Sequence, residues 1–108
     1  MQRLNSAPLL KSMSTMIVHF KSFGPIRRLL EKQLIEVEVS EQSTILQVIQ
    51  KVVDISDPSL RSLVMKNGDI DGNLIVMLNK KDVSTIGGVS LVVSEGDEIA
   101  LLPHVQGG

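Results

Sequence analysis

The chain has 108 residues, of which 43% are hydrophobic and 21% are charged, so one globular domain is expected rather than a disordered segment. Its 11 basic and 12 acidic residues nearly balance, and it contains neither Trp nor Tyr. Both features argue against direct binding to nucleic acid, which requires a basic surface and aromatic side chains that stack on bases. Because the chain has no cysteine, it cannot form disulfides or thiolate metal sites.

The N-terminal region lacks the pattern of a targeting signal. Leu9-Leu10 is followed directly by Lys11, which interrupts the apolar core that a secretory signal needs. No apolar run in the sequence approaches the ~18 residues of a membrane-spanning helix. We therefore expect a cytoplasmic protein that makes no contact with a membrane.

Three segments are predicted along the chain. Residues 1–15 show no sustained period and are interpreted as a flexible extension. A short functional arm, or a translation start at Met13 or Met16, is the alternative. Residues 16–103 are predicted to form the folded domain, and residues 104–108 a flexible tail.

The first elements of the domain predict a pair of strands. Residues 16–20 are rich in β-branched and aromatic side chains, which is typical of a strand. Residues 34–39 alternate between apolar and acidic side chains, which is the period of a half-buried strand. Between them, Gly24-Pro25 predicts a loop, with a helical turn over residues 26–32 as an option.

One amphipathic helix is predicted next. Thr44 is a candidate N-cap, and Gln47 three residues later completes a capping box. The apolar residues recur at the spacing of one helix face: Ile45, Val48, Ile49, Val52 and Val53. Residues 54–58 end this helix, and residues 58–66 are predicted to form a second, shorter one.

The second half of the chain predicts two more strands. Residues 74–78 are continuously apolar, which favours a strand buried on both faces. Residues 98–102 form the last predicted strand, and Pro103 ends it because proline cannot donate a backbone hydrogen bond. Turns separate the elements at residues 67–69, 71–73, 79–82 and 94–97. This order predicts an α+β fold, in which a mixed sheet of four or five strands carries the main helix on one face.

Side chains of a catalytic type are scattered. The two histidines, His19 and His104, do not stand at a metal-ligand spacing. Asp69 and Asp71 share a loop, but the ligand spacing of a calcium site does not continue, so a solvated turn is expected. The sequence therefore predicts no catalytic residue, no metal site and no cofactor bound by this chain.

The C-terminus carries a clearer signal. Gly107-Gly108 follows the last predicted strand by a few residues, and Pro103 sets the point where the tail departs. Extended, the six residues that follow the last predicted strand span about 20 Å, which is enough to enter the active-site cleft of another protein. Glycine has no Cβ, so the backbone passes through a narrow channel and the Gly108 carboxylate is unhindered. That carboxylate is the candidate reactive group.

Residues 95–108, EGDEIALLPHVQGG, resemble the C-terminal signature of the MoaD/ThiS sulfur carriers. The segment is also similar to the small archaeal modifier proteins and the eukaryotic ubiquitin-related modifier. That signature runs from acidic-Gly-Asp-Glu through an apolar strand to Pro-Pro-Val-x-Gly-Gly, and His104 stands where many members have a second proline. The resemblance implies a ubiquitin-like β-grasp fold over residues 16–103.

The resemblance also implies a carrier or modifier that is not itself an enzyme. A partner of the MoeB, ThiF or ubiquitin-activating type would use ATP to adenylate Gly108. The adenylate would become a thiocarboxylate for the molybdopterin synthase large subunit or a tRNA thiolation enzyme, or would be joined to lysines of target proteins. A β-grasp interaction domain that is never conjugated is the alternative.

Site residues follow from this mechanism. Gly108 is the expected site of adenylation, thiocarboxylation and isopeptide attachment. The residues expected to thread into the partner and to be recognised there are Pro103, His104, Val105, Gln106 and Gly107. A partner is also expected to dock on the sheet face that the helix leaves uncovered, with Phe20 and Leu101 as candidates beside the tail. The protein is expected to be a monomer.

Overall fold

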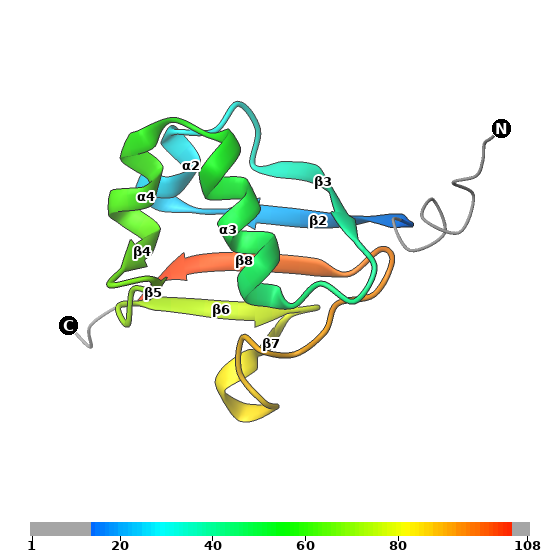
Figure 1. Cartoon of the computed structure of the whole chain (residues 1–108). Coiled ribbons are helices and arrows are strands. Elements are labelled where there is room, and N and C mark those ends of the chain that lie inside the picture. Colours follow the sequence, from blue (N-terminus) through cyan, green and yellow to red (C-terminus); the bar gives the residue numbers. More distant parts are fainter. Residues whose placement is uncertain (1–13, 105–108) are drawn as a thin grey trace, which may run out of the picture.

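The computed structural model describes residues 14–104 and forms a sheet with helices packed on one side (Figure 1). Its elements are β2 (Thr15–Ser22), α2 (Gly24–Arg28), β3 (Leu34–Ser40), α3 (Ile45–Ile55), α4 (Pro58–Val64), β4 (Met65–Lys66), β5 (Asp69–Ile70), β6 (Leu74–Leu78), β7 (Lys81–Asp82), η1 (Val83–Thr85) and β8 (Glu98–Pro103). No helix of the described residues is long and apolar enough to cross a membrane.

The main sheet has five strands in the order β3-β2-β8-β6-β7. The central strands β2 and β8 run parallel, with Phe20 opposite Ile99, whereas every other neighbouring pair is antiparallel. Helix α3 crosses one face of this sheet, and α4 packs beside it (Figure 1). The predicted α+β fold, with a mixed sheet and one main helix on one face, is confirmed.

Helix α3 begins where its capping box predicts. The Gln47 amide N–H donates to Thr44 Oγ1 over 3.2 Å, and the Thr44 N–H donates to Gln47 Oε1 over 2.9 Å. The apolar stripe of the helix is buried as expected: Ile45, Val48, Ile49, Val52 and Val53. These side chains pack against alternate residues of β2 and β3, including Val18 and Val37, to form the core.

Three details differ from the sequence prediction. The optional helical turn over residues 26–32 is helix α2, but it begins earlier, at Gly24, and holds Pro25 in its first turn, where the missing N–H is not needed. Strand β6 is not buried on both faces: only Val76 is buried, because helices cover one side of the sheet alone. Thr15, expected in the extension, is the first residue of β2 and pairs with Ser40.

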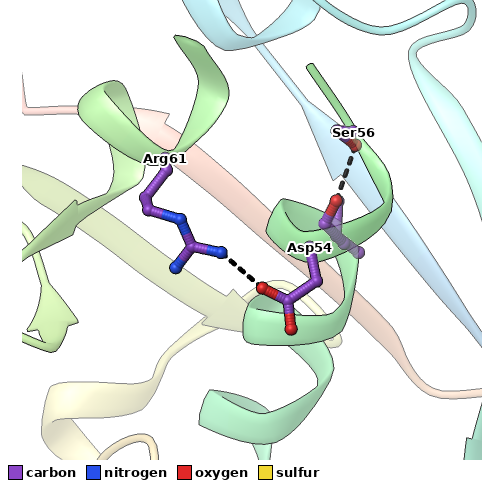
Figure 2. Close-up of polar contacts among 4 residues, drawn as sticks. Asp54, Ser56 and Arg61 are labelled. Carbon is purple, nitrogen blue, oxygen red and sulfur yellow. Dashed lines mark hydrogen bonds and ion pairs between the residues drawn. The ribbon is translucent and has the colours of Figure 1, made fainter. Parts of the chain in front are cut away.

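Two polar contacts lie at the C-terminal end of α3, and one of them reaches α4. Figure 2 shows the Ser56 hydroxyl donating to the Val52 carbonyl, over 2.6 Å, and the ion pair between Arg61 and Asp54. Both charged side chains of that pair are more than half exposed, so the pair adds little stability. Apolar packing contributes more to holding α4 in place, since its Leu60 is fully buried in the core.

Candidate functional site

The tail is carried by β8, a strand inside the sheet that pairs with β2 on one side and with β6 on the other. Ile99 and Leu101 are fully buried, and Ala100 is 7% exposed. A strand paired at both edges and packed in the core is a rigid base. The tail therefore starts from a fixed point.

The acidic motif that precedes β8 holds the start of this strand in place. The Gly96 N–H donates to the Ile17 carbonyl over 2.8 Å, and the Ile17 N–H donates to Glu95 Oε1 over 3.0 Å. The Asp97 carboxylate accepts from the Asn79 side chain at 3.0 Å and from the Ser94 N–H at 2.7 Å. These acidic residues are structural: they connect the turn before β8 to β2 and to the turn that follows β6.

At the other end of β8, the root of the tail is equally well defined. Pro103 is the last residue of the strand and lies opposite Leu74 of β6. The His104 N–H then donates to the Asn73 carbonyl over 2.8 Å. Pro103 and His104 are both exposed, so the last two described residues are held by the sheet while their side chains face solvent.

A small apolar pocket lies beside this root. It has a volume of about 70 Å³ and is lined by Phe23, Pro25, Ile26, Leu63, Leu74 and Pro103. We call it the tail-root pocket. Its walls come from the start of α2, from α4 and from the neighbouring ends of β6 and β8, which lie together at one end of the sheet (Figure 1).

A second, open hollow of about 470 Å³ reaches His104, and its lining includes Ile70, Asp82 and Val83. Both of its carboxylates are already engaged. Asp71 accepts a hydrogen bond from the Asn73 N–H, and Asp82 accepts from the Ser84 hydroxyl and N–H. The bonds from Ser84, the hydroxyl first, hold the pKa of Asp82 below its usual range. Within residues 14–104, no cluster of three His, Cys, Asp or Glu side chains could hold a metal ion.

A model of the ThiS family matches residues 21–108, from within β2 to the last residue of the chain. The chain belongs to the ThiS family. A putative sulfur carrier protein from Archaeoglobus fulgidus is 26% identical over 69 residues, which cover 64% of this chain and 78% of the relative. The resemblance to the MoaD/ThiS sulfur carriers, inferred from the C-terminal motif, is confirmed by this match.

Solved structures show the same fold. The small archaeal modifier protein 1 from Methanosarcina acetivorans superposes with a TM-score of 0.75 at 20% identity, over 88% of this chain and 99% of that one. A putative molybdopterin converting factor, subunit 1, from Pyrococcus furiosus has a TM-score of 0.68 at 21% identity, over 83% of this chain and 99% of that one. The β-grasp fold implied by the C-terminal motif is confirmed.

The docking prediction for two residues of this ThiS-family chain is wrong. Phe20 is 1% exposed and Leu101 is 0% exposed, and both lie in the core beneath the helices. Strand alternation and the register place other side chains on the uncovered face: Ile17, His19, Lys21, Ile75, Met77, Ala100 and Leu102. A partner that docks on this face would meet those residues instead.

The remaining predicted site residues divide into two groups. The structure brings Pro103 and His104 together at the tail root, whereas residues 105–108, with Val105, Gln106 and the two glycines, lie outside the described residues. The sequence prediction missed the tail-root pocket entirely. Its one local signal is Gly24-Pro25, a pair that predicts a loop rather than a pocket wall.

Proposed function

We propose that this ThiS-family protein is a carrier whose Gly108 carboxylate is activated by a partner enzyme and then thiocarboxylated or conjugated. The observation that carries the proposal is the family match, which extends through Gly107-Gly108. The fixed tail root at Pro103 and His104 supports it, because a rigid domain that ends in a short glycine tail presents a carboxylate to another protein's cleft.

The chemistry requires activation because a free carboxylate is a poor electrophile. In the proposed step, a Gly108 carboxylate oxygen attacks the α-phosphorus of ATP, an acyl-adenylate forms, and pyrophosphate leaves. Hydrosulfide supplied by the partner then attacks the acyl carbon, displaces AMP and loses its proton, which leaves a C-terminal thiocarboxylate. Alternatively, a lysine amine of a target displaces AMP, loses a proton and forms an isopeptide bond.

This chain's own contribution to those steps is presentation. Pro103 and His104 fix where the tail leaves the domain, and the two glycines leave the backbone near the reacting carbon uncrowded. ATP and the catalytic groups belong to the partner, an enzyme of the MoeB, ThiF or ubiquitin-activating type. The product would then go to the molybdopterin synthase large subunit, to a tRNA thiolation enzyme or to target lysines.

An ATP–pyrophosphate exchange assay with the activating enzyme encoded in the same genome tests the proposal. The full chain should support exchange, and a chain that lacks Gly107-Gly108 should not, while both melt at nearly the same temperature. Equal exchange from the two chains would leave the second candidate, a β-grasp interaction domain that is never conjugated. The 26% identical putative sulfur carrier favours the thiocarboxylate route over conjugation.

Mass spectrometry of the protein recovered from its own cells separates the two fates. Replacement of one terminal oxygen by sulfur identifies a carrier. A Gly-Gly remnant on lysines of other proteins, after proteolysis at a basic residue introduced before Gly107, identifies a modifier.

A further inference from the structure

The part of the tail that follows the described residues is short. Four residues lie beyond His104, and fully extended they span about 14 Å. An enzyme that binds both ATP and the Gly108 carboxylate inside a cleft must therefore bring its own surface against the tail root. The side chains around Pro103 are consequently the part of this domain that a partner cannot avoid.

The tail-root pocket occupies that position. Pro103 of β8 lines the pocket, and so does Leu63 of α4, which is 37% exposed. The side chains that line the pocket are all hydrocarbon: Phe23, Pro25, Ile26, Leu63, Leu74 and Pro103. A recess of this kind offers no hydrogen bond from a side chain, so it favours an apolar occupant that removes its walls from water.

Other exposed apolar side chains lack a purely apolar setting. The hollows at Leu34 and Val92 are also lined by charged side chains, such as Glu36 and Glu95. Ile55 is 67% exposed at the end of α3 and does not line the tail-root pocket. A single exposed apolar residue needs no functional explanation, whereas an apolar recess at the root of a reactive tail is continuous with the partner's cleft.

We infer that the activating enzyme inserts an apolar side chain into the tail-root pocket, and that this contact positions the domain while Gly108 enters the active site. The inference rests on the proposed function. Pockets that receive an apolar anchor are typical centres of binding energy in protein interfaces. Because Pro103, the last residue of the pocket lining, precedes the reacting Gly108 by five residues, losing the pocket should weaken docking and leave the chemical step intact.

The experiment is steady-state ATP–pyrophosphate exchange with Leu63→Glu and Pro25→Glu as two independent variants. Pro25 is exposed at the first turn of α2, where a glutamate is compatible with a helix N-terminus. Each variant should raise the KM for this protein by roughly tenfold or more, the size of a lost anchor contact, with kcat nearly unchanged. Leu63→Met keeps the wall apolar and should raise the KM far less than Leu63→Glu does.

Two matched controls locate the effect. Ile55→Glu places the same charge on the neighbouring helix away from the pocket and should leave KM unchanged. Ile75→Glu places a negative charge on the uncovered sheet face and so tests whether the enzyme docks there. A large KM effect for Ile75→Glu with none for Leu63→Glu and Pro25→Glu would overturn the inference in favour of docking on the sheet face.

Failure of this inference is distinguishable from failure of the proposed function. If the parent chain supports exchange and both pocket variants keep its KM and melting temperature, the pocket does not bind the enzyme. If the parent chain supports no exchange at all, the activation proposal fails, and the pocket inference fails with it.

Discussion

Gly24 packs against Pro103: a Cβ placed on Gly24 would lie 3.6 Å from Pro103 Cγ, an ordinary van der Waals distance. The space therefore accepts an alanine, but the backbone does not, because Gly24 has φ +61°. A left-handed backbone at a residue with a side chain costs roughly 1–2 kcal/mol. This glycine lets α2 begin beside the tail root.

We predict that Gly24→Ala lowers the free energy of unfolding by roughly 1 kcal/mol in urea denaturation. Gly72→Ala is the matched control, since a Cβ placed on Gly72 would meet no atom within 4 Å and its φ is outside the left-handed region. That variant should be nearly neutral. Equal stability of the two variants would show that the backbone at Gly24 relaxes without cost.

The register of α3 gives a second prediction. Val48 is 0% exposed, so Val48→Asp would place an unpaired charge in the core and should cost several kcal/mol. Ile55→Asp, on the same helix at 67% exposure, should change the midpoint of thermal unfolding far less. If both variants melt with the parent, the helix does not pack as described.

A buried hydroxyl supplies the third prediction. Ser22 is 0% exposed, and its Oγ has no hydrogen-bond partner within residues 14–104. Ser22→Ala removes this unsatisfied group and should raise the free energy of unfolding by about 1 kcal/mol. Ser56→Ala should do the reverse by a similar amount, about 1 kcal/mol, because Ser56 Oγ donates to the Val52 carbonyl (Figure 2). Urea denaturation of the two variants measures both free energies of unfolding. A lower value for Ser22→Ala than for the parent would contradict the prediction.

Signals in consecutive residues made much of the fold predictable. The Thr44–Gln47 capping box and the stripe from Ile45 to Val53 are local, and so the position and buried face of α3 follow from the sequence. Which side chains of a strand face the helices does not follow from the local sequence. In β8, Ile99 to Leu102 are apolar without alternation, and only the pairing with β2, distant in sequence, decides which side chains face the helices.

The same distinction applies to the candidate site. Gly108 was recognisable as a candidate because Gly107-Gly108 and the motif before β8 are each contiguous in the sequence, and its reactivity stays a prediction. The tail-root pocket was not, since Phe23, Leu63 and Pro103 come from three parts of the chain that only folding brings together. No spacing in the sequence connects a residue before α2 with residues of a second helix and the last strand.

Two helix caps predict a dependence of stability on pH. Asp57 accepts from the Ser59 hydroxyl at 2.6 Å and from its N–H at 2.8 Å, and these bonds hold the pKa of Asp57 below its usual range. The pKa of Asp82 is held low by Ser84 in the same way. A carboxylate with a lowered folded-state pKa stabilises the fold above its unfolded pKa, near 4, and this contribution is lost as pH falls through the folded-state pKa.

Thermal melts between about pH 5 and pH 2 test this dependence, because they cross the ordinary titration range of aspartate. The difference in melting temperature between the parent and the double variant Asp57→Asn/Asp82→Asn should shrink as the pH falls. Asparagine still caps a helix but does not titrate. Ser59→Ala removes the strongest contact of Asp57 and should make its share of the pH dependence smaller. A constant difference between parent and double variant across this range would rule the effect out.

The last prediction concerns the two terminal glycines. Gly108→Ala should reduce pyrophosphate exchange in part, because a methyl group beside the carboxylate crowds both the attack on ATP and the channel. Gly107→Val should reduce it further, since a β-branched side chain restricts the backbone that must thread the cleft. Both variants should melt at the temperature of the parent, because they follow Pro103, the last residue of β8.

Comparing kcat/KM for exchange across the parent, Gly108→Ala, Gly107→Ala and Gly107→Val separates the effect of side-chain size from the effect of β-branching at the penultimate position. Exchange by Gly107→Val at the parental rate would show that the partner does not enclose the tail, and the threading role of Gly107 would have to be abandoned.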